Sequence, residues 1–343
     1  MRLIIPISFA VLLLALILPL FLVSGPEAVA PVNAEPNEPV EEALPTVEAG
    51  EESSPLQDEQ LILQILLGEE MHEMSMAAFL EGVVAAEMPA RFHPEALRAQ
   101  AVAARTYTLH RMLVGPAARH PEAYVCGSYL CCKAFHDEER LRERWGDGFD
   151  HYNAIIQDAI RATDGLILLY EDRPILAAFH AASYGYTEAS GAIWASVPYL
   201  QSVPSFEGEE VPRFTVDVEL TFAEFREIAQ REIPGAAFYD GNVHSWVLDL
   251  SHTDSGRLAS LAIGGVTVSG AEFRRAFGLR STAVRFAFSD IGITITTGGH
   301  GHGVGMSQFG ANAMAEMGKD FREILHWYYT DVHMGSMSSL FAD

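Results

Sequence analysis

The chain has 343 residues, of which 49% are hydrophobic and 10% aromatic, so it is able to bury at least one sizeable core. Its formal net charge is −24, and residues 1–90 carry −14 of it, because Arg2 is the only lysine or arginine before Arg91. No stretch of the sequence forms a basic patch that would release counterions from phosphates, which argues against nucleic acid as a partner.

The first feature along the chain is an uncharged apolar run over residues 3–23. A helix of that length spans about 30 Å, the thickness of the hydrocarbon core of a bilayer. We therefore expect residues 1–24 to form a transmembrane anchor, with a cleaved signal peptide as the alternative because Ala28-Val-Ala30 suits a cleavage site. The absence of basic residues between Arg2 and Arg91 predicts a single-pass protein of the cell membrane with its N-terminus inside and its C-terminal domain extracytoplasmic.

A Pro- and Glu-rich segment with few large apolar residues follows the apolar run. Such a composition cannot bury enough surface to offset the entropy of ordering, so we expect a disordered linker over residues 25–60. Residues 61–343 are then expected to be the folded domain.

The folded domain begins with a predicted buried strand at 61–67, after which Ser75 is placed to cap a helix over 76–87 that ends before Pro89. Pro94 opens a second, alanine-rich helix that runs to about Met112. Further strands are expected at 165–170, 175–180, 214–220, 244–250, 258–267 and 291–297, and further helices at 311–317 and 321–329. This order of helices, then strands, then helices predicts an α+β fold with a mostly antiparallel sheet.

Glu87 stands at the end of the otherwise apolar first helix. A carboxyl group in such a place loses solvation, which favours its neutral form and suits a general acid. A solvated glutamate at a helix end is the other interpretation of the same pattern. Glu81, six residues earlier, lies on a different face of the helix.

All three cysteines of the chain lie within seven residues, at Cys126, Cys131 and Cys132, and His120 precedes them. Outside the cytoplasm Cys126 can form a disulfide with either of the other two. One histidine and three thiols also match the tetrahedral ligand set of zinc. The spacing leaves both interpretations open.

A glycine-rich loop covers residues 298–310 between the last predicted strand and a helix, and it contains His300, His302, Ser307 and Gln308. Glycines in this position let the backbone approach a ligand or another backbone closely. The Gly-x-Gly spacing does not indicate a dinucleotide site, because no βαβ unit surrounds it.

Four segments in this order resemble the stage II sporulation protein D family, which are peptidoglycan lytic transglycosylases of endospore-forming bacteria. The segments are FLEGVVAAEMPA at 79–90, ALRAQAVAARTY at 96–107, FHAAS at 179–183 and GHGVGMSQFGA at 301–311. The resemblance extends over about residues 61–335.

The resemblance implies cleavage of the MurNAc-β-1,4-GlcNAc bond in glycan strands stripped of stem peptides, leaving a 1,6-anhydroMurNAc end, during sporulation engulfment. Glu87 matches the catalytic acid of the family. In such a reaction the C6 hydroxyl of the sugar is the nucleophile, so one carboxyl group suffices where ordinary glycosidases need two.

The resemblance also assigns substrate contacts. Arg105 matches an active-site arginine, which we expect to position substrate or to support the charge of Glu87. The other residues expected to bind the glycan are His180, Ser183, Thr187, His302, Ser307 and Gln308.

A zinc site of the family maps onto His120, Cys126 and Cys132, with Cys131 where the family often has a histidine. This implies a structural Cys₃His zinc site with no position left open for water. The chain also departs from the family at Lys133-Ala134-Phe135, where Gln-Ala-Tyr is usual, and the departure concerns substrate detail more than reaction type.

The alternative function is a non-catalytic glycan-binding or amidase-enhancing module of a wall-remodelling complex. The presence of both Glu87 and Arg105 favours catalysis. The expected partners are peptidoglycan glycan strands, the membrane through the N-terminal anchor, a cell-wall amidase and other engulfment proteins.

Overall fold

The computed structural model describes residues 56–116, 119–129, 131–239 and 242–341. Its helices are α2 (Met76–Glu87), α3 (Pro94–Val114), α4 (Glu138–Trp145), α5 (Phe149–Arg161), α6 (Phe222–Glu232), α7 (Gly270–Ala276), α8 (Gln308–Glu316) and α9 (Phe321–Tyr328). Its strands are β1 (Ile62–Leu67), β2 (Glu70–Ser75), β3 (Val125–Cys126), β4 (Leu166–Tyr170), β5 (Arg173–Pro174), β6 (Phe179–His180), β7 (Thr215–Thr221), β8 (Val247–His252), β9 (Leu258–Ile263), β10 (Val266–Ser269), β11 (Ala283–Phe288), β12 (Gly292–Gly298), β13 (Met306–Ser307) and β14 (His333–Ser336).

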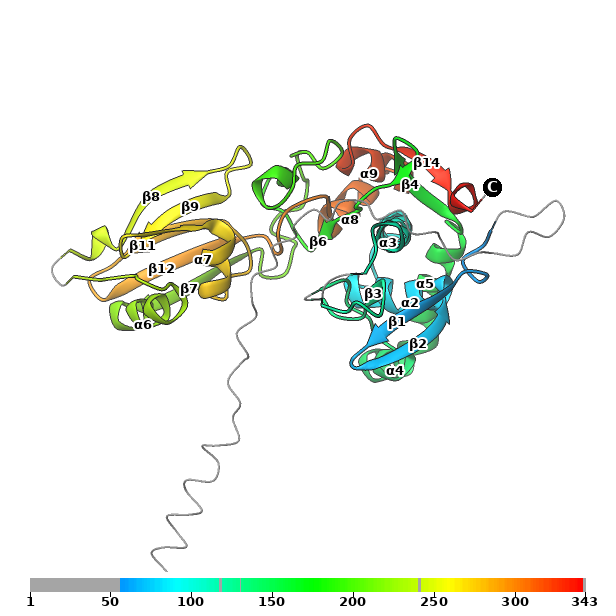
Figure 1. Cartoon of the computed structure of the whole chain (residues 1–343), viewed down its shortest axis with the longest axis horizontal. Helices are drawn as coiled ribbons and strands as arrows, with labels where there is room; N and C mark the ends of the chain where they lie inside the picture. Colours follow the sequence, from blue (N-terminus) through cyan, green and yellow to red (C-terminus); the bar gives the residue numbers. More distant parts are fainter. Residues whose placement is uncertain (1–55, 117–118, 130, 240–241, 342–343) are drawn as a thin grey trace, which may run out of the picture. The chain divides into compact units, whose positions relative to one another are not determined.

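The described residues form the expected α+β fold, in which the sheets are small and mostly antiparallel (Figure 1). No helix among them is long and apolar enough to cross a bilayer. The anchor predicted for residues 1–24 and most of the linker predicted for 25–60 lie outside the described residues.

The predicted C-terminal end of the linker, at residue 60, lies too far along the chain. Leu56 already packs against the first hydrophobic core, and Asp58 is only 2% exposed. The backbone N–H of Asp58 donates to Asp164 Oδ1 at 2.8 Å. Residues 56–60 therefore belong to the folded part, because a buried aspartate supplies long-range partners that composition alone does not reveal.

Helix α3 is central to the first core and contacts α2, α5, α8, α9 and β4. Its alanines at 99, 101, 103 and 104 are at most 1% exposed. Small side chains let neighbouring backbones approach closely, so the alanine-rich sequence accounts for a helix packed on several sides. The helix begins at Pro94 as predicted and ends at Val114, two residues beyond the expected Met112.

Helix α2 has the predicted bounds, Met76–Glu87. The Ser75 hydroxyl accepts a hydrogen bond from the backbone N–H of Ala78 at 3.2 Å, which satisfies one of the free donors of the first turn. After Glu87 the backbone becomes extended at Met88, and Pro89 follows. The helix therefore presents Glu87 at its last turn.

Strand β1 forms an antiparallel hairpin with β2, a strand that was not predicted, and a short parallel pair with β3. In that parallel pair Leu66 lies opposite Cys126. The sheet thereby attaches the cysteine segment to the first core.

The predicted strand at 175–180 was wrong over most of its length. The N–H of Ala177 donates to Ile175 and that of Ala178 to Leu176, which are tight turns rather than ladder bonds. Only β6 remains extended there, and it pairs in parallel with β13, with Phe179 opposite Met306 and His180 opposite Ser307. This pair joins two of the four segments that carry the resemblance.

A second hydrophobic cluster forms around the sheets β11-β12-β7 and β10-β9-β8, with α6 and α7 beside them (Figure 1). Phe277 lies 4.8 Å from Phe225 and 4.7 Å from Phe273 between ring centroids. The strand predicted at 258–267 is two strands, because Gly264 and Gly265 have φ of +53° and +84° and turn the chain between β9 and β10.

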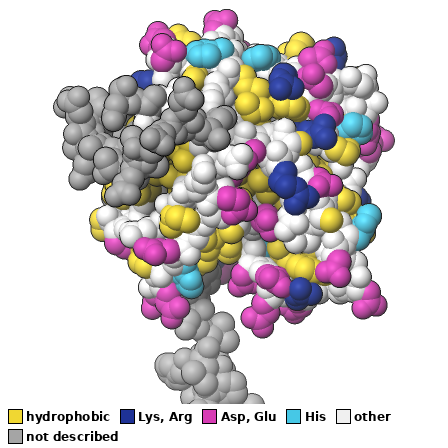
Figure 2. All heavy atoms as spheres, turned by 90° about the vertical axis from the view of Figure 1, so that its right-hand side faces the viewer, with side chains coloured by type: hydrophobic (Ala, Val, Ile, Leu, Met, Phe, Trp, Pro, Cys, Tyr) yellow, Lys and Arg dark blue, Asp and Glu magenta, His cyan; other side chains and the backbone are white. Residues whose placement is uncertain are grey.

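The face shown in Figure 2 carries Lys and Arg side chains that stand apart from one another, with Asp and Glu side chains among them. Such mixing of signs gives no continuous positive field on this face.

Candidate functional site

Glu87 is half-buried and both of its carboxylate oxygens accept hydrogen bonds. Oε2 accepts from the Gln308 side-chain amide at 3.1 Å, and Oε1 accepts from the backbone N–H of Ala134 at 3.3 Å. The two donors come from the start of α8 and from the segment after the cysteines. Three segments distant in sequence thus fix the orientation of one carboxyl group, and Gln308 lies where the sequence analysis expected a site residue.

Lys133, which the sequence analysis noted only as a departure from the family, directly precedes the Ala134 that donates to Glu87. Its ammonium lies 3.5 Å from the ring centroid of Phe179 and 4.3 Å from that of Tyr107. Burial lowers the pKa of Lys133 to about 8, and the charges of Glu87 and Cys132 oppose that shift. The available signal was its rarity, since Lys133 and Lys319 are the only lysines in the chain.

Two histidines lie side by side in the same region. The rings of His180 and His302 are 5.7 Å apart between centroids, and Trp194 lies 5.2 Å from His302. Burial lowers the pKa of His302 to about 3, and the charge of Lys133 adds to the effect. Burial also lowers the pKa of His180 well below its usual value. Both imidazoles are therefore neutral at physiological pH.

Ser183 and Ser307 were expected to contact substrate, and the structure corrects this. Both are fully buried and serve an internal carboxylate, Glu207. Oε1 of Glu207 accepts from the Ser183 N–H at 2.5 Å and from the Ser307 hydroxyl, and Oε2 accepts from the Ser205 hydroxyl at 2.5 Å. The Ser183 hydroxyl itself lies 2.7 Å from His180 Nε2. The two serines fix the positions of loops, and their buried side chains are not accessible to a sugar.

Thr187 is also fully buried, contrary to the expected substrate contact. Its hydroxyl accepts from the Val203 N–H at 2.9 Å and donates to the Gln201 carbonyl at 3.3 Å. Thr187 therefore ties two loop segments together.

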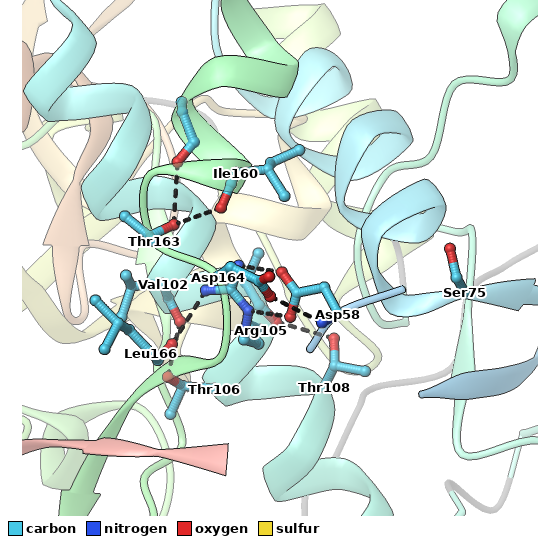
Figure 3. A network of polar contacts seen from close by, with 12 residues as sticks. Asp58, Ser75, Val102, Arg105, Thr106, Thr108, Ile160, Thr163, Asp164 and Leu166 are labelled. Carbon is cyan, nitrogen blue, oxygen red and sulfur yellow. Dashed lines mark hydrogen bonds and ion pairs between the residues drawn. The ribbon is translucent and has the colours of Figure 1, made fainter. Parts of the chain in front are cut away.

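The structure likewise corrects the role of Arg105. Its guanidinium is fully buried, and Nε donates to Asp58 Oδ1 at 2.7 Å while Nη2 pairs with Asp58 Oδ2. Nη1 donates to the Leu166 carbonyl at 3.0 Å (Figure 3). The fork of donors is thus used inside the fold, so Arg105 neither holds substrate nor supports Glu87 here.

The glycine loop brings its backbone against the backbone of other segments. Gly305 has φ of +72°, and a Cβ built on it would lie 2.0 Å from the Ala178 carbonyl oxygen. Gly303 has φ of +89° and would place a Cβ 2.6 Å from the Arg257 guanidinium carbon. The close approach predicted from the glycines is therefore internal, and it allows β13 to pair with β6.

His120, Cys126, Cys131 and Cys132 form one cluster, in which the four ligand atoms lie within 4.8 Å of one another. His120 Nδ1 lies 2.6 Å from the Ala123 carbonyl oxygen, which leaves Nε2 facing Cys132 Sγ at 3.3 Å. The three cysteines are free. A hydrogen bond with Cys132 lowers the pKa of Cys126 to about 5, and the same bond raises the pKa of Cys132. The cluster could hold a metal ion, with a backbone carbonyl orienting the histidine.

A cavity of about 710 Å³ opens elsewhere, between the β1–β2 hairpin and the helices α2, α4 and α5. Glu81 lines it and Glu87 does not. We place the candidate site at Glu87 because that carboxyl group is held by Gln308 of another resembling segment and by Ala134 of the segment that follows the cysteines.

Comparison with known proteins shows which family the chain is similar to. A family model described as SpoIID, stage II sporulation protein, matches residues 68–170. The chain is 35% identical over 260 residues to stage II sporulation protein D of Bacillus subtilis (strain 168), covering 76% of this chain and 74% of that protein. It is 34% identical over 270 residues to the protein of the same name from Bacillus amyloliquefaciens, covering 78% and 76%. The amidase enhancer of Bacillus subtilis (strain 168) is 29% identical over 301 residues, covering 73% of this chain and 39% of that protein.

Proposed function

Because the chain belongs to the stage II sporulation protein D family, we propose that it is a peptidoglycan lytic transglycosylase with Glu87 as its catalytic acid and base. The observation that carries the proposal is the Glu87 carboxyl group, held by Gln308 and by the N–H of Ala134. Such fixed orientation is what a proton-transferring group requires.

The reaction needs one carboxyl group. Glu87 gives its proton to the glycosidic oxygen between MurNAc and GlcNAc, and the C1–O bond breaks. The C6 hydroxyl of the same MurNAc attacks C1 and returns its proton to Glu87, which yields a 1,6-anhydroMurNAc end and restores the acid. Among the described residues no second carboxylate is hydrogen-bonded to Glu87, which is consistent with a mechanism that uses no second acidic group.

The test is product analysis on glycan strands freed of stem peptides. The purified extracytoplasmic part should release 1,6-anhydroMurNAc ends, and Glu87→Gln should abolish release while keeping the fold. Glu81→Gln, on the same helix but lining the separate cavity, is the matched control and should keep activity. Full activity in Glu87→Gln would refute the assignment.

A second candidate is a module that binds glycan and stimulates a cell-wall amidase without turnover. The similarity to the amidase enhancer is the observation that favours this second candidate. It predicts glycan binding, no anhydro product, and faster hydrolysis when an amidase is added. The two candidates are separated by whether the protein alone forms product.

We propose zinc as the ion of the His120 cluster, in a structural role. Three thiols and one imidazole fill a tetrahedral shell, so no position is left for water or substrate. Cys132 is directly followed by Lys133 and Ala134, so the ion would stabilise the segment that reaches Glu87.

The proposed location is the outer face of the cell membrane, with residues 1–24 as anchor and the folded part in the wall compartment during engulfment. It rests on the apolar run at 3–23 and on the charge asymmetry around it. Digestion of intact protoplasts by an added protease should remove the folded part, and full protection would contradict this topology.

A further inference from the structure

Lys133 is a half-buried cation held against two aromatic rings. Within the described residues its ammonium forms no hydrogen bond and no ion pair, and its neighbours are the faces of Phe179 and Tyr107. Lys319, by contrast, is exposed and lies 2.7 Å from Glu323. A partly desolvated charge held by two aromatic rings and left unpaired is prepared for an anionic ligand.

The position of Lys133 relates that anion to the reaction. Ala134, the residue directly after Lys133, donates its backbone N–H to Glu87 Oε1 at 3.3 Å. Phe179 belongs to β6 and Tyr107 to α3, so two of the four resembling segments contact this ammonium, and Glu87 of a third is hydrogen-bonded to the next residue, Ala134. An anion bound to Lys133 would therefore lie beside the bond that Glu87 cleaves.

The proposed substrate carries an anion at that place. Each MurNAc has a lactyl ether on C3, two ring bonds from the C1 that reacts. Its carboxylate is free when the stem peptide has been removed, and it is a neutral amide when the peptide is attached.

We propose that Lys133 binds the free lactyl carboxylate of the MurNAc at the scissile bond and so adds a charge-based preference for peptide-free strands. Attachment of a stem peptide removes the charge that the ammonium pairs with and adds bulk at the same atom. The inference rests on the proposed function, and it concerns a residue at which this chain departs from the glutamine usual in the family.

The experiment compares two substrates that differ in charge alone. One is peptide-free glycan with free lactyl carboxylates, and the other is the same glycan with those groups converted to primary carboxamides. For the wild-type protein kcat/KM should be roughly 10–100-fold higher on the carboxylate form, the range expected for a hydrogen bond to a charged group. Lys133→Gln should bring the ratio close to one, mainly through KM, and Lys133→Arg should restore part of it.

Lys319→Gln is the matched control, because it removes the only other lysine and leaves the site untouched. It should keep both the rate and the substrate ratio. A general disturbance of the fold in Lys133→Gln would lower both substrates equally, and an unchanged ratio in that variant overturns the inference.

Failure of the proposed function gives a different result. If the wild-type protein releases no anhydro product from either glycan, binding of the two glycans is measured instead by calorimetry. A preference for the carboxylate form that Lys133→Gln abolishes would support the role of Lys133 in a binding protein. Equal binding of the two forms by the wild-type protein would overturn it.

Discussion

The side-chain amide of Gln308 donates a hydrogen bond to the carboxylate of Glu87 at 3.1 Å, across 221 positions of sequence. Gln308 is the first residue of α8 and Glu87 the last of α2. The glycine loop therefore acts in the proposed chemistry through its residue Gln308, while its glycines serve internal packing.

Replacing Gln308 by Leu should lower kcat roughly 10–100-fold with a smaller effect on KM, because Glu87 loses a donor that fixes its orientation. Steady-state kinetics on peptide-free glycan measure the split. Glu316→Gln, on the exposed side of the same helix, should behave as wild type. A Gln308→Leu variant with unchanged kcat would show that the contact has no part in turnover.

Breaking the buried pair of Arg105 and Asp58 should destabilise the fold. Asp58→Asn leaves the Arg105 charge without its counter-ion and should lower the free energy of unfolding by about 3–5 kcal/mol. Denaturant titration measures this, and Lys319→Gln, which breaks an exposed pair, should change the free energy of unfolding little. The activity per folded molecule should persist in Asp58→Asn. Loss of that activity in fully folded protein would indicate that Arg105 has a role in the active site.

Glu207→Ala should destabilise the protein by about 2–5 kcal/mol, since it leaves the buried donors of Ser183, Ser205 and Ser307 without their acceptor. Thermal unfolding checks the prediction. The neighbouring exposed Glu209→Gln should change the midpoint little. Equal midpoints for the two variants would mean that water replaces the carboxylate without cost.

Removal of the proposed zinc should lower both stability and activity. Cys126→Ser takes away one ligand and should reduce bound zinc from about one per chain to near zero by elemental analysis. Because Ala134 follows the cluster and donates to Glu87, activity should fall with the metal and return when chelated wild-type protein is reloaded with zinc. Metal-free protein with a Cys126 disulfide, found by mass spectrometry, would favour the other interpretation of the cysteines.

Stability should decrease on acidification, with His302 as one cause. The pKa of His302 is lowered from 6.5 to about 3 in the folded state, so below pH 6.5 the unfolded chain binds a proton that the folded chain does not. The contribution of His302 is complete above pH 6.5 and is lost as the pH falls towards 3, with a slope of at most about 1.4 kcal/mol per pH unit. His302→Gln should flatten this part of the stability profile, whereas exposed His326→Gln should not. Parallel profiles for all three proteins would assign the acid sensitivity to other groups.

The sequence by itself determined the local features. Ser75, the apolar run to Glu87 and Pro89 defined α2, and Pro94 with its alanines defined a buried α3, because caps and short-range periodicity act within a few residues. It also grouped the four metal-ligand candidates, which the structure brings together.

Only the tertiary structure decided which polar groups meet. The sequence analysis expected Arg105 and Ser307 to contact substrate, but their partners in the fold, Asp58 and Glu207, lie 47 and 100 positions away and have no local signature. The same holds for Lys133, whose aromatic partners come from two other elements. A buried charge or hydroxyl takes its role from the partner that packing brings within hydrogen-bond distance, and that distance is set by the whole fold.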